Sequence, residues 1–192
     1  SLMAWMDLLE SSGVDPSLLS DMNKDVNRLS VIAERFSKIG SKPEMELIYV
    51  NEVLENATEY MRRRVSDKVL ITTHLPSDAE GAMVCLSLFE WVIENLCKNA
   101  VDAMNGEGRI DVYMTSEKQQ IYIDIKDTGK GIARKNFKTV FNPGYTTKKR
   151  GWGLGLTLAK RIIEDYHAGR IYVKDSEVGK GTIFRIELKR VV

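Results

Sequence analysis

The chain has 192 residues and a net charge of +1, with 43% hydrophobic and 29% charged residues. This length suits one domain with an appendage or two small domains, and the composition argues against an intrinsically disordered chain. No stretch approaches the ~18 uninterrupted apolar residues that a membrane-spanning helix needs. Cys85 and Cys97 lack CxxC spacing, which argues against a disulfide framework or a metal site and favours reduced cysteines in a cytoplasmic protein.

Two helices are predicted at the start of the chain. The first covers residues 2–9 and has no capping residue before it, which suggests that the sequence is cut from a longer protein. The second begins at Asp15-Pro16, a capping residue followed by a proline at the first helical position, and ends at Gly40. Along it, apolar residues recur at alternating steps of three and four: Leu19, Met22, Val26, Leu29, Ala33 and Phe36. This spacing predicts an antiparallel helical hairpin over residues 1–42; a helix lying on the neighbouring domain is the alternative.

Residues 43–192 are predicted to form an α+β domain. Strands are expected over residues 44–50, 68–75, 110–114, 121–125, 170–174 and 182–189, and helices over 51–64, 86–104 and 154–166. Apolar and polar residues alternate in the strands over 110–114 and 121–125, as in a sheet that buries one face. Helices are therefore expected to cover one face of a mostly antiparallel sheet.

Two glycine-rich clusters, residues 127–131 (DTGKG) and 151–155 (GWGLG), bracket a basic segment. From Thr128 to Ile163 the chain has nine Lys or Arg and no Asp or Glu. Glycine lets backbone N–H groups approach phosphate oxygens closely, and the predicted helix after Gly155 has an N-terminus that attracts anions. These features together favour a polyanionic ligand; an ordinary solvated loop is the alternative for the cations alone.

Three polar residues of the predicted helix over 86–104 share one face, because Asn95, Asn99 and Asp102 follow one another at steps of four and three. Their side-chain oxygens could coordinate a hard cation such as Mg²⁺ together with bound phosphates, and an ordinary solvated face explains them equally well. Asp127 ends a predicted strand. Its carboxylate could accept a hydrogen bond from an amine such as that of adenine, although a plain turn is the simpler explanation.

Five short motifs over about residues 86–192 occur in an order that resembles the nucleotide-binding boxes of sensor histidine kinases. The motifs are Glu94-Asn95-Leu96-Cys97-Lys98-Asn99-Ala100, Asp127-x-Gly129-x-Gly131, Phe141-x-Pro143-Gly144-Tyr145-Thr146-Thr147-Lys148, Gly151-x-Gly153-Leu154-Gly155-Leu156 and Gly179-x-Gly181-Thr182. The resemblance implies an α+β fold of the Bergerat (GHKL) ATP-binding type, a two-layer α/β sandwich over residues 43–192. It identifies residues 1–42 as a truncated dimerisation and phosphoacceptor hairpin.

The resemblance also implies the site residues, with ATP and Mg²⁺ as cofactors. Asn99 would hold Mg²⁺ and Asn95 would line the phosphate side. Asp127 would accept the adenine amine in a pocket shaped by Gly129, Gly131 and Thr182. The remaining expected nucleotide-binding residues belong to a lid or lie beside it: Asp102, Phe141, Tyr145, Thr147, Lys148, Lys149, Arg150, Gly151, Gly153, Leu154 and Gly155. Of these, Gly153 and Gly155 would present backbone amides to the phosphates.

One departure from the family pattern concerns the phosphoacceptor histidine. The chain has only His74, which closes a predicted strand, and His167, which ends a predicted helix. Both lie outside the hairpin and are expected to be structural, with His167 interacting favourably with its helix C-terminus. The acceptor should lie upstream of Ser1, so the chain is expected to bind Mg·ATP without phosphorylating itself.

Further departures concern the site itself. Asn95 stands where ATP-hydrolysing relatives, the gyrase, mismatch-repair and chaperone ATPases, carry a general-base Glu. An amide cannot take a proton from water at neutral pH, so slow ATP hydrolysis is expected. Trp152 replaces the small residue usual between the lid glycines, and Asp102 stands where many members have a basic residue.

Three functions compete. The first is the catalytic module of a two-component histidine kinase, and the second is a nucleotide-binding or interaction module without transfer activity, such as a pseudokinase or an anti-sigma-type regulator. The third, nucleic-acid binding, is disfavoured because the cations are confined to one loop without stacking aromatics. The first function implies a response regulator as partner, a homodimer through the hairpin of the full-length protein, and a cytoplasmic domain without membrane contact. These residues do not encode whether the parent protein is membrane-anchored.

Overall fold

The structure is a computed structural model that describes residues 15, 18, 19, 22, 43–148 and 153–191. The chain divides into two compact units, Ser1–Pro43 and Glu44–Val192. In the first unit Leu18, Leu19 and Met22 are helical. The rest of the predicted hairpin lies outside the described residues, as do the seam positions Val26, Leu29, Ala33 and Phe36.

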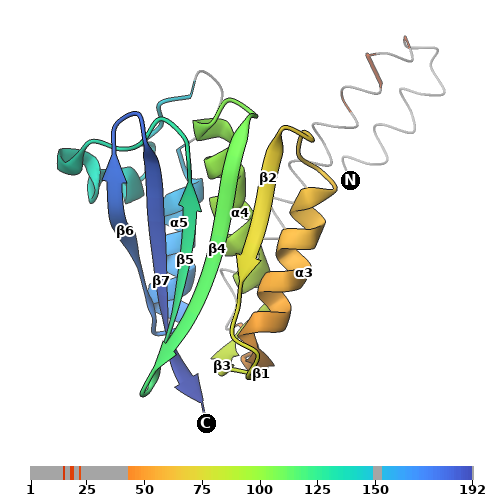
Figure 1. The fold of residues 1–192 in the computed structure, drawn as a ribbon, viewed down its shortest axis with the longest axis vertical. Helices are drawn as coiled ribbons and strands as arrows, with labels where there is room; N and C mark the ends of the chain where they lie inside the picture. Colours follow the sequence, from red (N-terminus) through yellow and green to blue (C-terminus); the bar gives the residue numbers. More distant parts are fainter. Residues whose placement is uncertain (1–14, 16–17, 20–21, 23–42, 149–152, 192) are drawn as a thin grey trace. The chain divides into compact units, whose positions relative to one another are not determined.

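The second unit is built on a seven-stranded sheet (Figure 1). Its strands are β1 (Glu46–Tyr49), β2 (Val69–His74), β3 (Gly81–Val84), β4 (Gly108–Glu117), β5 (Gln120–Asp127), β6 (Arg170–Glu177) and β7 (Gly181–Val191). The order across the sheet is β1-β3-β7-β5-β4-β2, and β6 pairs with β7. Only the pair of β2 with β4 is parallel among the strand pairs of the described residues.

Three α-helices, α3 (Val50–Arg62), α4 (Leu86–Ala103) and α5 (Gly155–Arg161), lie on one side of the sheet (Figure 1). A π-helical turn, Ile162–Tyr166, continues α5, and short 3-10 turns cover Arg134–Asn136 and Thr139–Phe141. The apolar side of α4 repeats at steps of one and three, which gives a continuous buried stripe. Its buried residues are Leu88, Phe89, Val92, Ile93, Leu96, Cys97 and Ala100. No helix among the described residues is long and apolar enough to cross a membrane.

Alternation along the central strands separates the core from the helix-free face. Ile121, Ile123 and Ile125 of β5 are at most 1% exposed. In the neighbouring strand β7, Ile186 pairs with Ile123 and Phe184 pairs with Ile125, and both are buried. Each fully buried side chain of this size contributes roughly 1.5–3 kcal/mol, so this apolar row fixes which face of the sheet meets the helices.

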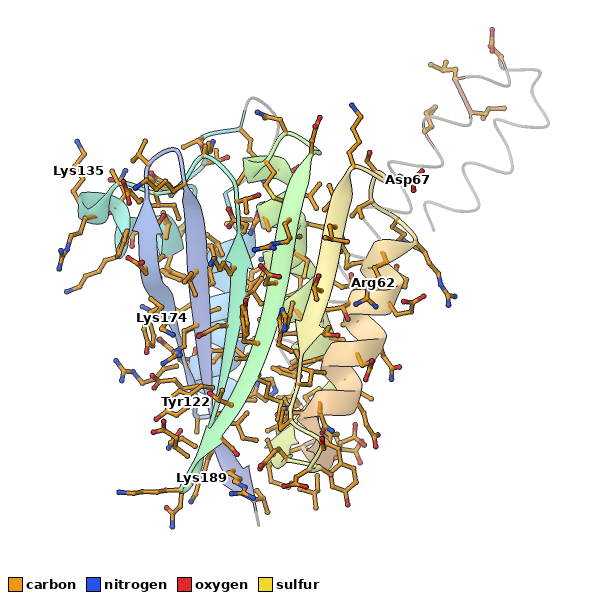
Figure 2. The ribbon with its side chains drawn as sticks, viewed as in Figure 1. Arg62, Asp67, Tyr122, Lys135, Lys174 and Lys189 are labelled. Carbon is orange, nitrogen blue, oxygen red and sulfur yellow. The ribbon has the colours of Figure 1, made fainter. Side chains whose placement is uncertain are left out.

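The helix-free face carries paired charges. Arg185 donates to both oxygens of Asp124, at 2.6 and 2.7 Å, and Lys174 donates to the same carboxylate at 2.7 Å. Although burial acts in the opposite direction, these hydrogen bonds lower the pKa of Asp124. Arg185 also lies 4.9 Å from the ring centroid of Tyr122, and Figure 2 shows where Tyr122 and Lys174 lie. The charged groups of this patch are therefore satisfied by one another.

The free edge of β2 is covered from α3. Arg62 donates from Nε to the carbonyl oxygen of Ile71 at 3.1 Å and pairs with Glu59 at 3.0 Å (Figure 2). An edge strand presents unpaired backbone groups that invite pairing with another chain. The guanidinium of Arg62 donates a hydrogen bond to one of these backbone carbonyl groups.

The buried carboxylate of Glu80, the residue just before β3, contacts side chains of both β4 and β7. Glu80 is 4% exposed, accepts a hydrogen bond from Ser116 of β4 at 2.7 Å and forms an ion pair with Arg190 of β7. The carbonyl of Glu80 accepts from Val50 at 2.9 Å, and its N–H donates to the side chain of Asn51 at 3.4 Å. These contacts attach β1 and β3 to the longer strands.

The α+β prediction, with helices over one face of a mostly antiparallel sheet, is confirmed. Three details differ. Strand β3 was not predicted, because its four residues lie in an apolar run that continues into α4. Asn51 does not cap α3, which begins at Val50, since the Asn51 oxygen accepts from Glu80 instead. The predicted helix over 154–166 changes to a π-helical turn after Arg161.

His167 is buried between the start of α4 and the end of the π-helical turn. Its Nε2 accepts a hydrogen bond from the backbone N–H of Cys85 at 2.9 Å, and its ring meets Phe89 edge-on with centroids 6.1 Å apart. Burial lowers the pKa of His167 to about 4, and the hydrogen bond that Nε2 accepts from Cys85 requires the neutral ring. The expected charge interaction with the helix C-terminus is therefore wrong, because the imidazole is neutral at pH 7.

We expect His167 to make stability fall in mild acid. Its folded pKa of about 4 lies below the ordinary 6.5, so its contribution is complete above pH 6.5 and is lost as the pH falls towards 4. Relative to His167→Gln, which keeps a neutral acceptor, the wild type should lose roughly 3 kcal/mol of unfolding free energy between pH 7 and 4. Urea denaturation across this range measures the difference, with His74→Gln as control. Parallel pH profiles of wild type and His167→Gln would contradict the expectation.

Candidate functional site

The polar stripe predicted on the helix over 86–104 lies on α4. Asn95 and Asn99 are half-buried and Asp102 is exposed, while the other side of the helix belongs to the core. Cys97 lies between the two asparagines in sequence but points into that core, and burial raises the pKa of its thiol to about 12. The thiol is therefore a packing group, and the chemistry available on the polar stripe comes from two amides and one carboxylate.

Asn95 lies against the first residue of α5. A Cβ added to Gly155 would lie 2.5 Å from Asn95 Oδ1, so a larger residue there would displace the Asn95 side chain. The Nδ2 atom of Asn95 is buried and has no acceptor among the described residues. A buried donor without a partner is costly, and a ligand oxygen would satisfy it.

Asn99 and Asp102 hold a cationic side chain together. The ammonium of Lys148 donates to Asn99 Oδ1 at 2.9 Å and to Asp102 Oδ2 at 2.5 Å. The side-chain oxygens of Asn99 and Asp102 thus face the positive charge of Lys148. No cluster of three or more His, Cys, Asp or Glu side chains suited to a metal occurs in the described ranges, so a metal here would need oxygens from its ligand as well.

Asp127 ends β5 as a buried carboxylate, 3% exposed. It accepts a hydrogen bond from the N–H of Gly129 at 2.8 Å and another from the N–H of Thr182. Burial raises the pKa of Asp127, and these two hydrogen bonds oppose the rise. The carboxylate is oriented by the backbone on both sides.

The loop after Asp127 is packed against the end of α4. A Cβ on Gly129 would lie 2.7 Å from the carbonyl carbon and oxygen of Ala103, and the next N–H, of Lys130, donates to that oxygen at 2.9 Å. Gly131 has φ +70, and a Cβ there would collide with the carbonyl of Glu177. The Asp127 loop is therefore joined through backbone contacts to the last turn of α4, next to the stripe.

The lid is anchored at its base. Phe141 is buried and meets Phe184 edge-on with centroids 6.2 Å apart, and its carbonyl accepts from Thr157 of α5 at 2.9 Å. The N–H of Gly144 donates to the carbonyl of Gly153 at 3.1 Å, which closes the neck of the loop. Phe141 thus packs into the core, where it positions the lid.

The other predicted lid residues are more exposed. Tyr145 and Leu154 are half-buried, while Thr147 is exposed and accepts from Lys130 Nζ at 2.9 Å. Lys149, Arg150, Gly151 and Trp152 lie outside the described residues, so the predictions made for them stay predictions.

Ser176 is a site residue that sequence reasoning missed. Its hydroxyl donates to the carbonyl of Gly181 at 2.8 Å, accepts from Ile132 at 2.7 Å and lies 3.0 Å from the Thr182 hydroxyl. It joins the loop after Asp127 to the start of β7. A lone serine five residues before a glycine turn carries no signal, because the contact depends on the pairing of β6 with β7.

The chain matches one protein-family model and is similar in sequence to several sensor kinases. The model of the family described as "Histidine kinase-, DNA gyrase B-, and HSP90-like ATPase" matches residues 86–192. Sporulation kinase A of Bacillus subtilis is 40% identical over 99 residues, 52% of this chain and 16% of that protein. Sensor kinase CckA of Brucella abortus is 30% identical over 199 aligned residues, 93% of this chain and 21% of that protein. The chain therefore spans about a fifth or less of the length of these relatives.

Solved structures share the fold. The catalytic domain of histidine kinase ThkA has a TM-score of 0.67 and 23% identity, covering 77% of this chain and 96% of that domain. A structure of ThkA in complex with response regulator protein TrrA has a TM-score of 0.72 and 19% identity, covering 99% of this chain and 57% of the ThkA chain. At this identity the likeness shows the fold alone, and it agrees with the two-layer sandwich predicted above.

Two glycines of one turn allow a matched test of the packing around Asp127. A Cβ on Gly181 would collide with the Asp127 carbonyl at φ +119, whereas a Cβ on Gly179 at φ +85 would meet nothing within 4 Å. Gly179→Ala should therefore cost only the strain of a left-handed alanine, about 1–2 kcal/mol. Gly181→Ala should cost roughly 1–3 kcal/mol more because of the collision. Urea unfolding measures both variants, and equal losses would show that the close approach does not matter.

Proposed function

Since the family model matches more than half of it, the chain belongs to the histidine kinase-, DNA gyrase B- and HSP90-like ATPase family, and we propose that it is the ATP-binding catalytic module of a two-component sensor histidine kinase. It would supply the γ-phosphoryl group of Mg·ATP to a histidine outside these residues. One observation supports this most strongly. Helix α4 carries the Asn95–Asn99 stripe, and the carbonyl of its last residue, Ala103, holds the loop of Asp127.

Asp127 would recognise the adenine base. A buried carboxylate that already accepts two backbone N–H groups has capacity for another donor, which the exocyclic amine of adenine supplies. A base with a carbonyl at the same position would place two acceptors against each other. The adenine preference of the site would therefore come from one side chain.

Asn95 and Asn99 would meet the phosphate side. The unpartnered Nδ2 of Asn95 would donate to a phosphate oxygen, and the Oδ1 of Asn99 would hold Mg²⁺, whose charge offsets that of the phosphates when bound. Neither amide can act as a general base. Glu94 is rotated by ~100° on the helix and pairs with Lys98 at 3.4 Å, so slow ATP hydrolysis is expected.

The histidines described here are poor phosphoacceptors. The Nε2 of His167 is occupied in the core, and His74 stacks on Tyr113 with centroids 4.4 Å apart on the helix-free face. The sheet separates His74 from α4. The acceptor would therefore come from a hairpin helix upstream, with dimerisation through that hairpin and a response regulator as the next recipient. ThkA is seen in complex with a response regulator protein, TrrA, and a cytoplasmic location fits this role.

Nucleotide selectivity tests the roles of Asp127 and Asn99 by calorimetry. Inosine triphosphate differs from ATP by a carbonyl in place of the adenine amine, and it should bind about 100-fold more weakly or worse. Asn99→Ala should lower the affinity for Mg·ATP about tenfold and leave that for ATP in EDTA nearly unchanged. Equal binding of the two nucleotides would refute the role of Asp127, and an unchanged Mg²⁺ dependence would refute that of Asn99.

Phosphorylation tests the kinase assignment. With γ-labelled ATP, the 192-residue chain should acquire no acid-labile, alkali-stable label, whereas a longer protein that includes the upstream segment should be labelled. His74→Gln and His167→Gln serve as controls for adventitious label. Acid-labile label on the 192-residue chain itself would overturn the assignment of the acceptor. A longer protein that binds Mg·ATP without becoming labelled would favour a binding module without transfer activity.

A further inference from the structure

Lys148 is held on α4 by two residues one turn apart. Its ammonium donates to Asn99 Oδ1 and Asp102 Oδ2, and the short turn that presents it is shaped by a hydrogen bond from its own N–H to Thr146 Oγ1 at 3.1 Å. Its neighbour Thr147 is fixed by Lys130. Lys148 therefore reaches α4 from a locally ordered turn.

The atom that holds Lys148 is also the atom that the proposed function assigns to the metal. Asn99 Oδ1 is a single acceptor at 2.9 Å from the ammonium, and a divalent cation on this oxygen would lie within a few ångström of that charge. Like charges at such a separation repel each other, although water screens the repulsion at this exposed contact. Lys148 and a divalent cation therefore compete for Asn99.

Asp102 adds the ionic part of the contact. Within the described part of the chain the Asp102 carboxylate contacts Lys148 alone, whereas Glu94 on the same helix pairs with Lys98. Asp102 is about half exposed, and exposed ion pairs are weak because water screens them. Such a pair is strong enough to bias the position of Lys148 and weak enough to be exchanged.

We propose that Asp102 is a positioning residue that retains Lys148 on α4, and that a divalent cation arriving with nucleotide at Asn99 expels Lys148 towards the phosphates. This rests on the proposed function. When the ammonium of Lys148 leaves Asn99, it becomes available to the phosphates of the nucleotide. Metal binding and the phosphate contact of Lys148 are therefore coupled. Asp102 sets the strength of that coupling.

Amine reactivity tests the retention of Lys148 in protein without nucleotide. A lysine held between two acceptors is less accessible to an acylating reagent, so it reacts more slowly than a free one. With sulfo-N-hydroxysuccinimidyl acetate and peptide mass spectrometry, Lys148 should react about threefold faster in Asp102→Ala than in wild type. Glu94→Ala removes one acid from the same helix and should leave Lys148 unchanged. Equal reactivity of Lys148 in wild type and Asp102→Ala would overturn the proposal.

Calorimetry with Mg·ATP tests the exchange. Asp102→Ala removes part of the cost of expelling Lys148, so it should bind Mg·ATP about threefold more tightly than wild type. In the Lys148→Met background the same substitution should change affinity by less than about 1.5-fold, because no lysine remains to be retained. Equal gains in both backgrounds, or an equal gain in Glu94→Ala, would show a general charge effect and overturn the proposal. Failure of the wild type to bind Mg·ATP would instead refute the proposed function, and the reactivity of Lys148 would still decide whether Asp102 holds it.

Discussion

The close contact between the Asp127 loop and the end of α4 is the constraint on which the site depends. At Gly129 the backbone of the loop lies so near the Ala103 carbonyl that no side-chain carbon fits, and the N–H of Lys130 completes the junction. A buried carboxylate at the end of a strand is thereby held at a fixed position relative to a polar helix face. Because both halves are joined through backbone, their spacing is set by the fold before any ligand binds.

Charge is distributed differently on the two sides of the sheet. On the helix-free face Asp124, Arg185 and Lys174 form a closed network with short hydrogen bonds. On the site side, one buried donor of Asn95 lacks a partner and one cation is held by exposed groups. The first arrangement favours a stable surface, whereas the second leaves groups available for exchange with a ligand.

The sequence predicts the architecture well because the patterns are long and regular. Alternation at Ile121, Ile123 and Ile125 specifies the buried face of the sheet, and the steps of four and three from Asn95 to Asp102 specify the polar side of α4; the structure agrees with both. What could not be predicted depends on contacts between distant residues. Asn51 accepts a hydrogen bond from Glu80 instead of capping its helix, and Ser176 reaches the loop after Asp127 only because β6 pairs with β7 in this register. The ion pair of Asp102 with Lys148 likewise joins positions far apart in the chain. His167 was placed correctly at a helix end, but its burial, which removes its charge, depends on Cys85 and Phe89.

Helix α4 is attached to its surroundings at both ends. At its start the N–H of Cys85 is bonded to His167, and at its finish the carbonyl of Ala103 is bonded to Lys130, in each case at 2.9 Å. A helix between two such bonds can neither slide by a residue, which is ~1.5 Å, nor roll by a residue, which is ~100°. The direction in which Asn95 and Asn99 project from the helix is therefore set by residues that contact neither of them. Core substitutions in the middle of α4 can change how tightly the helix packs while the two amides keep their direction.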